Sequence, residues 1–103
     1  PCYNFKMIIT FKCHGTEDIY NGKRTVAARK VCPVQCLKVA LRKLDQLDSA
    51  FKLDDLRSPP GNRLESLPGD RKGQHSIRIN DQYRICFNWT ADGPTNVEIV
   101  DYH

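Results

Sequence analysis

The length, composition and charge of this chain are those of one small folded domain. At 103 residues it can bury a single hydrophobic core, and no second core fits. Its 40% hydrophobic and 27% charged residues are ordinary for a globular protein, and no apolar run is long enough to span a bilayer. We therefore expect no membrane association and one domain over residues 7–103, with residues 1–6 an upstream extension or a cloning remnant.

The cysteines argue against a disulfide framework and against a metal site. Their number, five, is odd, and their spacing is irregular. Cys32 and Cys36 form a C-x3-C pair rather than the C-x2-C pair of zinc ribbons and redox motifs, and no second ligand pair accompanies them. We expect free thiols in a reducing cytoplasm, with no metal or other cofactor.

The formal net charge of +4 is unevenly distributed along the chain. Residues 1–53 hold ten lysines and arginines against four acids, whereas residues 54–103 hold six against eight. Such a basic half suits a phosphate backbone or an acidic partner, although charge alone is as typical of a solvated helix face. The basic helical residues are Lys23, Arg24, Arg29, Lys30, Lys38, Arg42 and Lys43.

The N-terminal half is predicted to contain a strand and two helices. Residues 8–12 are rich in β-branched and aromatic side chains and predict a strand. A short helix follows over residues 16–20, with Thr16 as its N-cap and Gly22 at its end. The pattern leaves open a further helical turn over residues 25–31.

The main predicted helix covers residues 33–50. Pro33 suits its first position, since proline lacks the N–H that a helix leaves unpaired there. Apolar residues recur at three- and four-residue steps and form one stripe, which we expect to face the core. The stripe consists of Val34, Leu37, Leu41, Leu44 and Leu47.

The C-terminal half is predicted to form strands separated by turns. Two prolines and a glycine end the helix within residues 54–62, and residues 62–67 are irregular or a short strand. Residues 68–73 are rich in turn formers. Residues 75–79 alternate apolar and polar side chains and lead into a tight turn, predicted because its Asn-Asp pair tolerates positive φ.

The segment 83–89 alternates strictly, and a final strand is predicted over residues 96–101. The alternation puts Tyr83, Ile85, Phe87 and Trp89 on one face, and Arg84, Cys86 and Asn88 on the other. The predicted fold is therefore α+β: a small antiparallel sheet of three to five strands with two N-terminal helices packed on one face.

The chain ends on an acid, a phenol and an imidazole, which are Asp101, Tyr102 and His103. They directly follow an apolar stretch, so a strand would hold them at the end of the sheet. Histidine exchanges a proton near neutral pH, which makes this strand end a candidate for acid–base chemistry. The alternative is a solvated tail.

A run of motifs in the C-terminal half carries a family resemblance. In order, they read LRSPPGNRLESL from Leu56, GDR from Gly69, GQHSIR from Gly73, YRICF from Tyr83 and VEIVDYH from Val97. Together they resemble the HigB family of bacterial toxins, within the RelE/ParE superfamily. The resemblance covers the chain from about Met7 to its end.

The resemblance implies a RelE-like fold and a function. It implies the toxin of a type II toxin–antitoxin system, a metal-independent endoribonuclease that cuts mRNA in the A site of the ribosome. The implied partners are the ribosome, mRNA and a cognate HigA-like helix-turn-helix antitoxin that neutralises the toxin. DNA would be contacted only indirectly, through the antitoxin.

By the same resemblance, four residues are assigned to catalysis. Arg84 would stabilise the crowded phosphate, because its charged guanidinium grips phosphate oxygens in pairs. The alternative for Arg84 is a structural salt bridge across the sheet. His103 would act as general acid or base. Tyr102 would stack on a base or share in proton transfer, and Asp101 would orient the imidazole or hold the terminus in place.

The loop that would meet RNA departs from the family pattern. Some members carry a histidine and a lysine where this chain has Glu65 and Pro68. Glu65 can act as a base, while Arg63 and Arg71 are the nearest residues that would supply the missing positive charge. His75 is a further candidate for RNA contact.

Two other functions stay open at this point. A toxin of the same fold can poison DNA gyrase, as ParE relatives do, and would need no acid–base residues. Alternatively, the chain would be a weakly active or inactive toxin that serves as transcriptional corepressor with its antitoxin. The altered loop keeps that alternative open.

Overall fold

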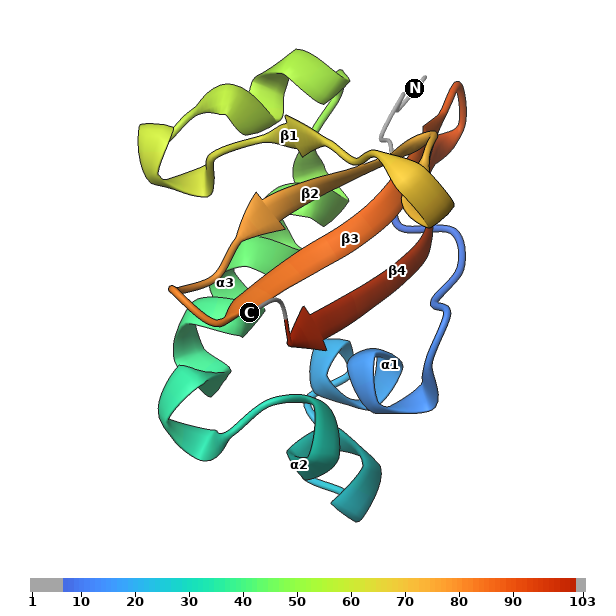
Figure 1. Cartoon of the computed structure of the whole chain (residues 1–103). Helices are drawn as coiled ribbons and strands as arrows, with labels where there is room; N and C mark the ends of the chain where they lie inside the picture. Colours follow the sequence, from blue (N-terminus) through green and yellow to red (C-terminus); the bar gives the residue numbers. More distant parts are fainter. Residues whose placement is uncertain (1–6, 102–103) are drawn as a thin grey trace.

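The computed structural model describes residues 7–101 and shows helices followed by a sheet (Figure 1). The helices are α1 (His14–Tyr20), α2 (Val26–Val31) and α3 (Val34–Ser49), followed by the short 3-10 turns η1 (Leu53–Arg57), η2 (Pro60–Asn62) and η3 (Gly69–Arg71). The strands are β1 (Glu65–Ser66), β2 (Gln74–Arg78), β3 (Tyr83–Thr90) and β4 (Gly93–Asp101). They form an antiparallel sheet in the order β1-β2-β3-β4, so the predicted α+β architecture is confirmed.

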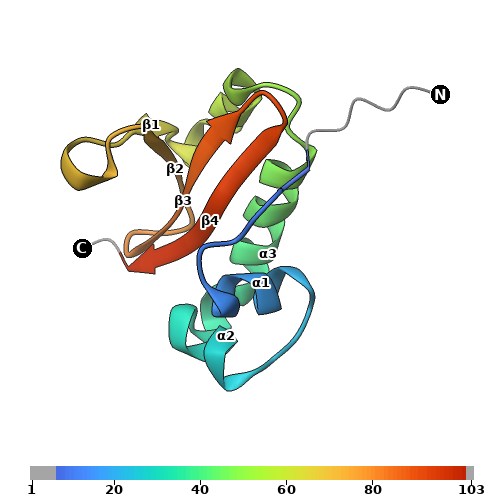
Figure 2. The ribbon, with the colours of Figure 1, turned by 90° about the vertical axis from the view of Figure 1, so that its right-hand side faces the viewer.

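One face of the sheet packs on α3, and no helix of residues 7–101 covers the other (Figure 2). The core joins Leu44 and Leu47 of α3 to Ile85 and Phe87 of β3, all fully buried. The alternation predicted along residues 83–89 is therefore confirmed, and it directs Arg84 to the uncovered face. Among residues 7–101, no helix combines the length and apolar character that crossing a bilayer requires.

The two short helices pack closely on each other at a glycine. A β-carbon on Gly15 would lie 2.4 Å from the carbonyl oxygen of Ala27 in α2, so no larger residue fits there without a shift. The Thr25 hydroxyl caps α2 by accepting from the Ala28 N–H (3.1 Å), and it donates to Asp18 of α1 (2.6 Å). The further helical turn that the sequence left undecided over residues 25–31 is thus present, as helix α2.

Thr16 does not have its predicted role as an N-cap. Helix α1 begins earlier, at His14, and Thr16 lies fully buried inside it. The Thr16 hydroxyl accepts the backbone N–H of Ile99 in β4 at 3.0 Å. A threonine whose hydroxyl pairs with a distant strand cannot be recognised from local helix signals, because the partner is set by the tertiary fold.

The predicted apolar stripe of the main helix is only partly buried. The helix begins at Val34, with Pro33 at the N-cap position. Leu44 and Leu47 are buried, but Val34 and Leu41 are 65% and 37% exposed. Each residue turns the helix by roughly 100°, so positions 34 and 41 lie on its flank rather than toward the sheet.

The predicted first strand forms only one bridge. Phe11 pairs with Val97 in parallel orientation, and backbone bonds from Ile9 to Pro94 and from Lys12 to Val97 (both 2.9 Å) hold the segment beside β4. Strand β4 bulges at this point. Two of its residues lie opposite the single residue Phe87, and one of the two, Asn96, has a φ of +53°. The bulge interrupts the ladder, so residues 8–12 follow β4 without forming a regular strand.

Candidate functional site

A polar cleft of about 240 Å³ opens on the uncovered side of the sheet. It is formed by the segment that leads into β1, by the end of β2 with the following turn, and by β3. Its lining residues are Arg63, Glu65, Arg78, Asn80, Asp81 and Arg84. Three of the six are arginines, so the cleft is a candidate site for an anion such as an RNA phosphate.

Arg84 is held at the base of this cleft by bonds to its neighbours. It is only 8% exposed. Its Nε donates to the Ser76 hydroxyl at 2.7 Å, and its Nη2 donates to the backbone carbonyl of Arg63 at 2.6 Å. The same Nη2 lies 3.5 Å from the carboxylate of Glu65. The cross-sheet ion pair considered from the sequence is therefore present, in a geometry that also orients the guanidinium toward the cleft.

A buried polar bond anchors the loop that carries Arg63 and Glu65. Asn62 is fully buried; it accepts a bond from Lys43 Nζ and donates to the carbonyl oxygens of Leu56 (3.1 Å) and Ser58 (3.3 Å). Arg63 follows with a left-handed φ of +46°, which turns the chain into β1. The loop is thereby fixed to α3, and its carbonyl and carboxylate are positioned at Arg84.

Lys43 consequently does not belong to the basic helical surface predicted from the sequence. It is 8% exposed, and burial, followed by repulsion from Arg42 and Arg78, lowers the pKa of its ammonium. Its stem lies along the buried side of α3 beside Leu44 and Leu47. Sequence charge patterns could not reveal this, because the partner, Asn62, comes from a separate loop.

Arg78 lines the cleft and was missed by the sequence analysis. It pairs in register with Arg84, so the two arginines lie side by side on the uncovered face. Asp81 forms an ion pair with its guanidinium. The alternation within residues 75–79, combined with the short turn after them, carried the signal that would have placed Arg78 opposite Arg84.

The tight turn predicted after β2 is present, but a side chain stabilises it in place of the expected positive φ angles. The Asn80 side-chain oxygen accepts the backbone N–H groups of Gln82 (2.9 Å) and Tyr83 (2.8 Å). Positive φ angles, the basis of the prediction, occur at neither Asn80 nor Asp81. The side chain of Asn80 thus fixes the turn that holds Asp81 against Arg78.

Arg71 lies on the same face but outside the cleft. Its Nη1 donates to Gln74 of β2 (3.0 Å) and to Glu98 of β4 (2.9 Å). Lys12 adds a second cation at 3.7 Å from the same Glu98 carboxylate. Arg71 therefore extends the polar surface along the sheet, and it does not join Arg63 and Arg84.

His75 lies on the opposite, core-facing side of the sheet. It pairs with Phe87 in register, and the two ring centroids are 6.1 Å apart. Its Nδ1 is 3.2 Å from the Ser66 hydroxyl. Burial lowers the pKa of the imidazole, which favours the neutral ring. The structure does not bring His75 together with Arg84.

The acid of the C-terminal triplet ends strand β4. Asp101 pairs with Tyr83 in register, is exposed, and accepts a bond from Gln82 Nε2 at 3.0 Å. The other two predicted residues, Tyr102 and His103, lie outside the described residues. Because Val100 pairs with Arg84, β4 ends one residue beyond the level of Arg84.

Metal-binding side chains do not gather in the described part of the chain. Within residues 7–101, no group of three or more histidines, cysteines or acids is close enough to hold an ion. Cys13, Cys32, Cys36 and Cys86 are free thiols. The cleft itself offers guanidinium, carboxylate and amide side chains.

Comparison with known proteins gives two kinds of match. Residues 9–103 match the sequence model of a family described as "RelE-like toxin of type II toxin-antitoxin system HigB". Toxin HigB-1 of Vibrio cholerae is 39% identical over 97 residues, which cover 94% of this chain and 98% of that toxin. An uncharacterized protein of Haemophilus influenzae is 38% identical over 65 residues, or 63% of this chain and 64% of the relative.

Proposed function

Because the chain belongs to the HigB family of RelE-like toxins of type II toxin–antitoxin systems, we propose that it is a ribosome-dependent endoribonuclease cutting mRNA in the A site. A toxin of this class has an antitoxin as its partner, and we assign that role to a HigA-like helix-turn-helix protein that neutralises the toxin. We propose that the toxin acts in the cytoplasm, where its proposed ribosomal target is found.

The observation that carries this proposal is the fixed guanidinium of Arg84 beside that of Arg78. Metal-free RNA cleavage places extra negative charge on the phosphate as the 2′-oxygen attacks it. Arg84 is already oriented by Ser76 and by the Arg63 carbonyl, so it stabilises that charge without reorganising. Arg63 and Arg71 line the approach of the RNA backbone on the same face.

The proposed reaction needs one base and one acid. Glu65, at 3.5 Å from Arg84, takes the proton of the ribose 2′-hydroxyl as its oxygen bonds to phosphorus. The bond from phosphorus to the 5′-oxygen breaks, and His103 gives that oxygen a proton. The products are a 2′,3′-cyclic phosphate and a 5′-hydroxyl. Asp101 pairs with Tyr83, on the face opposite Arg84, so its proposed role is to hold the terminus in place. Tyr102 stacks on a base.

One contact favours a second candidate function. The carboxylate of Glu65 offsets part of the positive charge of Arg84, which would weaken phosphate binding. A toxin weakened in this way would act chiefly as a transcriptional corepressor bound to its antitoxin. This candidate predicts normal antitoxin binding without RNA cleavage.

The test is to map mRNA 5′ ends after brief induction of the wild type, His103→Ala and His14→Ala. His14 is an exposed histidine of α1 and serves as the control. We expect new in-frame cuts within translated regions for the wild type and the control, and none for His103→Ala. Absence of cuts with normal growth would favour the corepressor, whereas growth arrest without cuts would indicate another target, such as DNA gyrase.

A further inference from the structure

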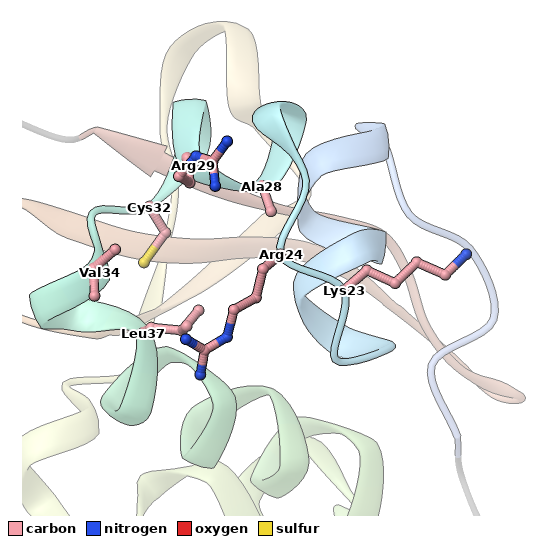
Figure 3. A pocket seen from close by; sticks show the side chains of 7 residues that line it. All are labelled: Lys23, Arg24, Ala28, Arg29, Cys32, Val34 and Leu37. Carbon is pink, nitrogen blue, oxygen red and sulfur yellow. The ribbon is translucent and has the colours of Figure 1, made fainter.

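A second pocket lies among the helices, away from the polar cleft (Figure 3). It has a volume of about 120 Å³ and is formed by the loop between α1 and α2, by α2 itself and by the first turn of α3. Apolar atoms of Ala28, Cys32 and Leu37 form its floor, and Val34 lies at its edge. The basic residues Lys23, Arg24 and Arg29 complete its rim. An apolar hollow with a basic rim is therefore presented by the helical side of the molecule.

The cations of this rim have no acidic partner within residues 7–101. Lys23, Arg24 and Arg29 are exposed, and none of them forms an ion pair or a side-chain hydrogen bond with the described part of the chain. Figure 3 shows Arg24 reaching toward α3, whereas Lys23 extends away from the other lining residues. The unneutralised guanidinium groups of Arg24 and Arg29 beside one hollow favour an acidic ligand.

Exposed apolar side chains extend the same surface. Val34, at the edge of the pocket, is 65% exposed, and Val26, at the start of α2, is 60% exposed. Farther along α3, Leu41 borders a shallower hollow together with Tyr20 and Arg42. Apolar groups beside a basic rim match a peptide that carries both apolar and acidic side chains.

We propose that this pocket anchors a segment of the cognate antitoxin in which an apolar side chain is flanked by carboxylates. The apolar side chain fills the hollow over Cys32 and Leu37, and the carboxylates pair with Arg24 and Arg29. A nucleic-acid backbone would satisfy the cations but would leave the apolar floor in contact with water, so the combination favours a peptide. The proposal rests on the toxin assignment above, since that assignment supplies the antitoxin.

The test compares two variants of equal charge change in binding to the purified cognate antitoxin, measured by titration calorimetry. Arg24→Glu/Arg29→Glu reverses two rim cations, and Lys30→Glu/Lys38→Glu reverses two exposed cations, one on α2 and one on α3, that do not line the pocket. We expect the rim variant to bind at least tenfold more weakly and the control to change less than threefold, with thermal midpoints alike. Val34→Ser probes the apolar edge and is expected to weaken binding about threefold.

Equal antitoxin affinity in the rim variant and the control would overturn the proposal. So would a rim variant that keeps its antitoxin affinity but no longer sediments with ribosomes, because the rim would then contact nucleic acid. The ribonuclease assignment is measured separately on programmed ribosomes. Loss of antitoxin binding in the rim variant therefore supports the docking site even if the wild type fails to cut mRNA.

Discussion

The two basic clusters of this molecule differ in how their cations are held. In the polar cleft, Arg84 is 8% exposed and bonded to Ser76 and to a backbone carbonyl, and Arg78 is paired with Asp81. On the helical side, Arg24 and Arg29 are exposed and have no acidic partner within residues 7–101. The cations of the polar cleft are thus held in place before a ligand binds, whereas the side chains of Arg24 and Arg29 can change conformation when a ligand binds.

This difference matches the two roles that we assign. A guanidinium fixed in advance stabilises a transition-state charge at little reorganisation cost, which is what a catalytic site requires. Exposed cations around an apolar hollow mainly increase the rate of association with a partner and the specificity of binding. Their contribution to binding falls as the salt concentration rises. We therefore expect variants of the polar cleft to lose mRNA cleavage and variants of the helical pocket to lose antitoxin binding.

The largest effect is expected for Arg84→Lys. Lysine keeps the charge but loses the forked donors that hold the guanidinium between Ser76 and the Arg63 carbonyl, so mRNA cleavage should fall roughly 100-fold. Primer extension on programmed ribosomes measures the rate. Arg57→Lys, at an exposed arginine paired with Asp54, is the matched control and should cleave normally. Normal cleavage by Arg84→Lys would remove Arg84 from the site.

The largest effect on stability, as distinct from cleavage, is expected for Asn62→Ala. The substitution leaves buried Lys43 without its acceptor and removes the bonds to Leu56 and Ser58, which should lower the free energy of unfolding by about 3 kcal/mol. Urea denaturation measures the change. Gln46→Ala removes one 3.2 Å bond to Asn62 and should lower stability by no more than about 1 kcal/mol. Equal losses in both variants would contradict the anchoring role of Asn62.

A smaller effect concerns Cys32, at the floor of the helical pocket. Burial, followed by the neighbouring Cys36, raises the pKa of its thiol from the usual 9.0 to about 11. The folded state then keeps the thiol proton up to a higher pH than the unfolded state does. The contribution of this thiol to stability is therefore fully present below pH 9 and falls between pH 9 and 11. At pH 10.5 the loss amounts to about 2 kcal/mol.

Urea denaturation under reducing conditions at pH 8 and pH 10.5 isolates this contribution. We expect Cys32→Ala to lose less stability than the wild type between the two pH values, by about the same 2 kcal/mol. An identical loss in the two proteins would show that the Cys32 thiol is not shielded, and that the floor of the pocket is open to water.

The smallest effect is expected for His75→Gln. The imidazole packs by Phe87 on the core-facing side of the sheet, so cleavage should stay within threefold of wild type. Burial lowers the pKa of His75 below its usual 6.5, so wild-type stability is present above that value and falls as the pH drops through the folded-state pKa. The variant should lose less stability between pH 7.5 and pH 5. A tenfold loss of cleavage would instead place His75 at the RNA.

Local periodicity predicted the parts of this fold that depend on backbone geometry. Alternation along a strand is a property of the extended chain, so residues 83–89 revealed both the core face and the opposite placement of Arg84. The same rule applied to β2 would have placed Arg78 beside Arg84.

Features that depend on distant partners could not be predicted in this way. The Thr16 hydroxyl accepts a hydrogen bond from Ile99, 83 residues farther along the chain, and Lys43 is buried where Asn62 accepts a hydrogen bond from its ammonium group. The exposed flank of α3 at Val34 and Leu41 depends on how the helix is rotated against the sheet. The rim of the helical pocket likewise arises only when α1, α2 and α3 are packed together.

The most direct test of the central claim is primer extension of a reporter mRNA on programmed ribosomes with the wild type, Arg84→Lys and Arg24→Glu/Arg29→Glu. We expect A-site cuts with the wild type and with the helical variant, and about 100-fold fewer with Arg84→Lys. Cuts of equal strength with Arg84→Lys, or their loss only in the helical variant, would contradict the assignment of catalysis to the sheet cleft.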